Sequence, residues 1–273
     1  DQLPIRATFD RGFISNPFTG NYLPHRIEKV EVTVKEGLPV AKPPDSDWVT
    51  LEFAPEIVVP GDAWLHWDPS QQRFITVAEK YPEGLTVPRK SVIHYRDDIF
   101  ENVTWHDGSP YTVGDMLLPQ VLSWDRGFEE SPVYDPAEAA NLKSAINNAR
   151  GWKILSMDPF VYEVYSEAWY IDAEQNLGDI FAVYYNYGAQ PWHTLALGML
   201  AEMNGELAFT ASKANALDVE WLGYNAGPSL PILDKWLDHA IETNYLPYVE
   251  FLSEFIPEEE IASRYAKAKA WYQ

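Results

Sequence analysis

Cysteine is absent from the 273 residues of this chain. The absence removes structural disulfides, thiolate metal sites and cysteine nucleophiles from consideration. Positive charge is also scarce, because 20 Lys and Arg stand against 41 Asp and Glu and leave a formal net charge of −21. A chain this acidic repels phosphate backbones and anionic headgroups, so we expect no nucleic-acid partner and no broad membrane-binding surface.

Catalytic and metal-binding motifs are equally scarce. The sequence holds no G-x-S-x-G elbow, no P-loop and no G-x-G-x-x-G run, so nucleophilic-serine, nucleotide and dinucleotide chemistry have no local support. Its six histidines include no pair at i, i+4 and no H-E-x-x-H motif. We therefore expect no bound metal and no cofactor. No run approaches ~20 apolar residues, which predicts that no helix spans a membrane.

Apolar and aromatic side chains are what the chain does contain. Hydrophobic residues make up 46% of it and aromatic residues 14%, which is too apolar for a disordered chain. Its length fits one large domain or two small ones. Because no repeat or low-complexity linker marks a boundary, we treat it as a single fragment of three regions. These are strands and loops over 1–100, a helix and a hairpin over 101–190, and helices over 191–273.

Alternation of apolar and polar residues dominates the first third. The stretches 30–34 and 49–53 alternate valine, leucine or phenylalanine with threonine or glutamate, which predicts half-buried strands. Two hairpins are also predicted, one joining 64–67 to 74–77 and the other joining 152–155 to 160–165. Each has an Asp-Pro turn signal between its strands, at Asp68-Pro69 and at Asp158-Pro159.

Helical patterns dominate the rest. Thr112 and Asp115 have the spacing of an N-cap hydroxyl and a carboxylate at the third helical position, so a helix should start at Thr112, with Pro119 bending or shortening it. Further helices are predicted over 136–149, 192–204, 229–243 and from Pro257 to the end. Because the last of these helices runs to the end of the sequence, we expect the native chain to continue beyond Gln273. The expected fold class is α+β, with a mixed, largely antiparallel sheet with hairpins covered by four to five helices.

One stretch resembles a known family. Residues 103–115 read V-T-W-H-D-G-S-P-Y-T-V-G-D and closely resemble the W-H-D-G-x-P-F-T-A-x-D signature of family 5 extracellular solute-binding proteins, the oligopeptide-, dipeptide- and nickel-binding class of ABC transporters. The signature residues are Trp105, His106, Asp107, Gly108, Thr112 and Asp115. The run D-P-F-V-Y-E-V at 158–164 resembles the D-P-Y-T-V-x-V hairpin that follows the signature in that family. Stretches at 13–20, 205–209 and 227–230 look like a long-form branch of the same family.

The resemblance implies a non-enzymatic function. Such a protein captures a small solute, a peptide, a sugar or a metal chelate, by lobe closure and delivers it to the membrane permease of an ABC transporter. It implies an extracellular or periplasmic monomer, with a lipid anchor as an option in the full-length protein. The implied fold is the insert lobe of a periplasmic-binding-protein-like type II fold. The G-x-G-P-Y segment by which the family chain returns to its first lobe is absent, so we expect an internal fragment that supplies one lobe.

Other interpretations of the same residues remain open. His106 beside Asp107 fits a general base pair, although Asp-Gly before Pro110 is ordinary turn chemistry and favours a structural role. The acidic, aromatic-rich composition also fits a secreted carbohydrate-active hydrolase or its accessory binding domain, which is the alternative function. A purely structural interaction module is the third.

The candidates for solute binding are aromatic. Flat rings bind diverse solutes with little loss of rotamer freedom, and several lie together in the chain. The candidates are Trp169, Tyr170, Tyr184, Tyr185 and Trp192. Core packing is the alternative role for each ring.

Overall fold

The computed structural model describes residues 10–178, 180, 190–224 and 227–272. The chain divides into two compact units, each assembled from segments that are far apart in the sequence. Unit 1 comprises Asp1–His66, Phe74–Ile99 and Ser144–Ala182, and unit 2 comprises Trp67–Arg73, Phe100–Lys143 and Val183–Gln273. The units therefore do not follow the three sequential regions 1–100, 101–190 and 191–273, because strands of the middle region pair with strands of the first.

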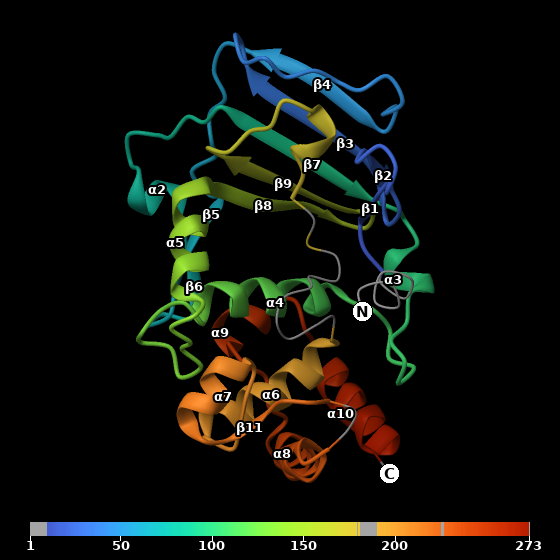
Figure 1. The fold of residues 1–273 in the computed structure, drawn as a ribbon, viewed down its shortest axis with the longest axis vertical. Coiled ribbons are helices and arrows are strands. Elements are labelled where there is room, and N and C mark those ends of the chain that lie inside the picture. The colour runs from blue at the N-terminus through green and yellow to red at the C-terminus, as the bar shows by residue number, and fades with distance from the viewer. Residues whose placement is uncertain (1–9, 179, 181–189, 225–226, 273) are drawn as a thin grey trace. The chain divides into compact units, whose positions relative to one another are not determined.

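A seven-stranded, mostly antiparallel sheet organises unit 1 (Figure 1). Its order is β4-β3-β7-β9-β8-β5-β6. The bounds are β3 Ile27–Lys35, β4 Val49–Ala54, β5 Trp64–Asp68, β6 Arg73–Thr76, β7 Arg89–Tyr95, β8 Ala149–Met157 and β9 Phe160–Ser166. β3 runs parallel to β4, whereas β7 pairs antiparallel with both β3 and β9. The predicted strands and both predicted hairpins are confirmed.

Alternation places the apolar positions of β3 in the core of unit 1. Val30, Val32 and Val34 are fully buried, as their period of two predicts. Short elements complete the unit. They are β1 Phe13–Ser15 paired with β2 Tyr22–Pro24, the helix α2 Val77–Lys80 and the 3-10 turn η1 Ala173–Gln175. The helices α3 Ile99–Asn102 and α5 Ala139–Asn148 have residues in both units.

Unit 2 is mainly helical. Its helices are α4 Val113–Asp125, α6 Trp192–Met203, α7 Ala211–Leu217, α8 Ser229–Thr243, α9 Val249–Leu252 and α10 Glu258–Tyr272. α6 is apolar on nearly all sides and is buried along most of its length, and it contacts α4, α8 and α10. A short parallel pair, β10 Leu207–Ala208 with β11 Glu220–Trp221, follows α6. Gly205, with φ of +66°, follows α6 in the left-handed conformation that commonly ends a helix.

The helix prediction needs three corrections. The described residues form nine α-helices rather than four to five, because α2, α3, α7 and α9 are too short to give a helical period in the sequence. The helix predicted from Pro136 begins at Ala139. Of the two effects predicted for Pro119, shortening is not observed, because α4 continues through it to Asp125. No helix in the described ranges has the length and apolarity that crossing a bilayer requires.

Candidate functional site

The signature stretch forms a tight turn in unit 2, immediately before α4. The amide of Trp105 donates to the Ser109 carbonyl at 2.8 Å, and the amide of Gly108 donates to the Trp105 carbonyl at 2.9 Å. Gly108 has φ of +77°, a conformation that favours glycine. The Oδ1 of Asp107 accepts the Ser109 amide at 2.8 Å and also the Ser109 hydroxyl. The turn predicted from Asp-Gly is confirmed.

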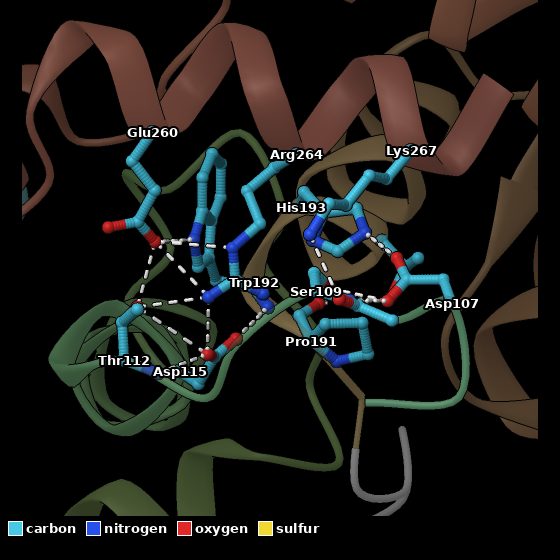
Figure 2. Close-up of polar contacts among 12 residues, drawn as sticks. Asp107, Ser109, Thr112, Asp115, Pro191, Trp192, His193, Glu260, Arg264 and Lys267 are labelled. Carbon is cyan, nitrogen blue, oxygen red and sulfur yellow. Dashed lines mark hydrogen bonds and ion pairs between the residues drawn. The ribbon is translucent and has the colours of Figure 1, made fainter. Parts of the chain in front are cut away.

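The second carboxylate oxygen of Asp107 contacts α6. His193 Nε2 lies 2.9 Å from Asp107 Oδ2, and the side chains of His193 and Asp107 are 0% and 9% exposed (Figure 2). A carboxylate only accepts hydrogen bonds, so the contact places a proton on Nε2 of the imidazole. Burial raises the pKa of Asp107, but the hydrogen bonds from His193 and Ser109 outweigh it and hold this pKa well below its usual range.

A second carboxylate, Asp115, joins the start of α4 to α6 and α10. Its Oδ2 accepts the Thr112 amide at 2.8 Å, which is the predicted reciprocal cap of the helix. The same oxygen pairs with Arg264 Nη2 of α10 at 2.8 Å. Its Oδ1 accepts the Trp192 amide, the first of α6, at 2.8 Å. One buried carboxylate therefore satisfies the amide ends of two helices and a buried cation.

Glu260 closes this arrangement from α10. Its Oε1 accepts the Thr112 hydroxyl at 2.8 Å and the Trp192 indole nitrogen at 2.9 Å (Figure 2). It also pairs with Arg264, one turn along the same helix, at 3.1 Å. We call the residues that fasten this turn the signature cluster. They are Asp107, Ser109, Thr112, Asp115, Trp192, His193, Glu260, Arg264 and Lys267, the last of which donates to the Gly108 carbonyl at 2.9 Å.

Each carboxylate of the signature cluster accepts hydrogen bonds from other members of the cluster. A serine nucleophile needs its hydroxyl hydrogen-bonded to a base, but Ser109 donates to Asp107 instead of His193. The histidine paired with Asp107 is His193, whereas His106, the adjacent residue considered above as a general base, is exposed. His193 could not be found from the sequence, because 86 residues separate it from Asp107 and no motif links them. The arrangement fastens a turn to α6 and α10.

The predicted aromatic candidates are distributed unevenly. Tyr170 is 49% exposed and Trp169 is partly buried, so both present surface in unit 1. Tyr184 and Tyr185 lie outside the described residues. Trp192 is 0% exposed, and its indole nitrogen is bound to Glu260. Core packing is therefore the observed role of Trp192, and a solute has no access to this ring.

Within the described ranges, no group of three or more His, Asp or Glu side chains could hold a metal ion. Among the described residues of unit 1, one surface hollow has a volume of about 410 Å³ and another a volume of about 500 Å³. The first is lined in part by His25, Glu28 and Arg96, and the second in part by Lys35 and Glu167. Neither hollow is lined by an aromatic residue predicted to bind solute or by a signature residue.

Comparison of the whole chain with protein-family models and with curated proteins finds no match in either set.

Proposed function

We propose that this chain is part of an extracellular solute-binding protein of the family 5 type, which captures a small, peptide-like solute for an ABC import system. The protein holds the solute without changing it. In this proposal the chain supplies one lobe of the protein, and that lobe is the insert lobe of a periplasmic-binding-protein-like type II fold. The solute stabilises the closed state of the lobes through its higher affinity for that state, and the permease recognises closure.

The observation that carries the proposal is the use made of the signature residues. Asp107 and Asp115 are the two carboxylates of the W-H-D-G…D stretch, and both are bound by neighbours from α4, α6 or α10. A reactive carboxylate needs a free lone pair or a transferable proton in contact with substrate. The two carboxylates hold the turn and α4 to α6 and α10. This structural use suits a binding lobe, which is the function that the resemblance implies.

The test is capture without turnover. The chain is heated alone, with pooled tri- to pentapeptides and with pooled neutral oligosaccharides, and the solute is recovered for mass spectrometry. We expect the peptide pool to raise the Tm by several degrees, since a ligand at 100 times its Kd adds about 2.7 kcal/mol to the free energy of unfolding. The recovered peptides should be intact. Shortened oligosaccharides would instead establish the hydrolase alternative.

Two variants test whether the signature residues have a structural role or bind the solute. Asp107→Asn should lower the Tm of the chain without solute. The increase in Tm that the solute causes should be the same as in the wild type. His106→Ala, which alters an exposed neighbour in the same turn, should change neither. Loss of capture in either variant, with a native circular dichroism spectrum, would place the signature in the binding site and contradict the proposal.

A further inference from the structure

A buried arginine stands at the start of β7 in unit 1. Arg89 is 5% exposed and pairs in the sheet with Val34 of β3 and Ser166 of β9. Every second residue of β7 is buried on the same face, so Arg89 shares that face with Ser91. An arginine on the buried face of a central strand is unusual, because its charge loses hydration there.

The guanidinium of Arg89 is poorly satisfied. Its Nη1 donates to the Leu177 carbonyl at 3.4 Å, which is at the long end of hydrogen-bond distances. Its Nε is buried and has no hydrogen-bond partner among the described residues. No carboxylate in those residues forms an ion pair with Arg89. The group can donate five hydrogen bonds, and the one to Leu177 is the donation observed to a described residue.

The other deeply buried arginines show how this chain satisfies such a charge. Arg126, 0% exposed, pairs with Asp135 at 2.9 Å, and Arg264, 1% exposed, pairs with Asp115 at 2.8 Å. Burial lowers the pKa of Arg89 to about 10, so this side chain remains a cation at neutral pH. Arg89 is therefore a buried positive charge without the counter-ion that comparable positions have.

The segment 170–177 contacts the buried face of β7 and includes Tyr170, which is half-exposed. Asn176 is 0% exposed, and its side chain accepts the Tyr170 amide at 2.9 Å and donates to the Tyr170 carbonyl at 3.0 Å. Ser91 donates to the Asn176 carbonyl, which holds the segment against the face of β7. The next residue of the segment, Leu177, accepts from Arg89 through its carbonyl. One segment therefore contacts both the backbone of Tyr170, whose ring is half-exposed, and the guanidinium of Arg89.

We propose that Arg89 binds a carboxylate group of the captured solute and that Tyr170 contacts the adjoining part of that solute. The planar guanidinium matches a carboxylate in a two-bond geometry, and such pairs are strongest where water is excluded. Because the chain carries a net charge of −21, a single negative charge suits this position better than a polyanion. This site rests on the proposed capture function and defines its substrate class, solutes with a free carboxylate.

The test compares two peptide pools that differ only at the carboxyl end. Tri- to pentapeptides with free C-termini and the same peptides as C-terminal amides are titrated by calorimetry into the wild-type chain, Arg89→Met and Arg89→Lys. Arg96→Met, which alters an exposed arginine of the same unit, is the matched control. A parallel arm replaces the peptides by uronic-acid oligosaccharides and their neutral counterparts, which identifies the source of the carboxylate. Urea midpoints without solute are measured for every variant.

The wild type should bind one carboxylate-bearing pool at least about tenfold more tightly than its neutral counterpart, and Arg89→Met should abolish that preference. Met fills similar volume without a buried charge, so the solute-free midpoint of Arg89→Met should equal or exceed that of the wild type. Arg89→Lys should keep part of the preference. A lower midpoint with unchanged preference would make Arg89 structural. Equal binding of charged and neutral pools would overturn this site alone, whereas binding of none by the chain and by the protein with both lobes would contradict solute capture itself.

Discussion

Asp107 is the residue whose replacement tests the signature cluster most directly. Its carboxylate accepts three hydrogen bonds, from the Ser109 amide, the Ser109 hydroxyl and His193 Nε2. In Asp107→Asn, the new amide nitrogen faces a donor whichever way it turns. His193 could become an acceptor at Nε2 only by moving its proton to Nδ1, which is buried and has no partner among the described residues. A hydrogen bond to a charged group contributes about 1.5–3 kcal/mol. We expect Asp107→Asn to lower the free energy of unfolding by about 2–3 kcal/mol at pH 7.

The pH dependence of this loss distinguishes the charge from the shape of Asp107. A carboxylate whose folded pKa is held below its unfolded value stabilises the fold above the unfolded pKa, which is about 3.9. That stabilisation is lost as the pH falls through the folded pKa. The wild type should therefore lose stability below about pH 4, while Asp107→Asn, which cannot titrate, should not show this part of the loss. The difference in free energy of unfolding between the wild type and Asp107→Asn should be constant above about pH 5 and should become smaller below about pH 4.

Urea unfolding followed by tryptophan fluorescence measures this difference. His106→Ala is the control, because its side chain is exposed in the same turn and its replacement should change the midpoint by less than about 0.5 kcal/mol. An Asp107→Asn midpoint equal to that of the wild type at pH 7 would refute the argument. So would a difference that stays constant down to pH 3, since it would not depend on ionisation of Asp107.

Two further predictions concern residues outside this pair. Burial, assisted by the positive charges of Lys80 and Arg150, lowers the pKa of His66 to about 4, so stability present above pH 6.5 is lost as the pH falls towards 4. His66→Gln should remove about 3 kcal/mol of that loss, measured from urea midpoints between pH 7 and pH 4, and an unchanged slope would contradict it. Gly114→Ala adds a Cβ 2.6 Å from Ile256 Cδ1, so the clash should exceed the gain of about 1 kcal/mol in helix propensity. Thermal unfolding should show a lower Tm, and a higher Tm would mean that Ile256 moves aside freely.

Local chemistry in the sequence determined most of the secondary structure. Alternation specified β3 and β4, and the Thr112-to-Asp115 spacing specified the start of α4, because each depends on residues only a few positions apart. The turn at Asp107-Gly108 was predictable for the same reason. Short helices were not, since fewer than two turns give no detectable period.

Only the tertiary structure decided the partners of the buried charges and the composition of the two units. His193 meets Asp107 across 86 residues, and Arg264 meets Asp115 across 149. Neither pairing has a signature in either local stretch, because a side chain's charge and size do not encode which distant residue will face it. The same holds for Arg89, whose burial and lack of a carboxylate partner among the described residues emerge only when the sheet and the segment around Asn176 are assembled.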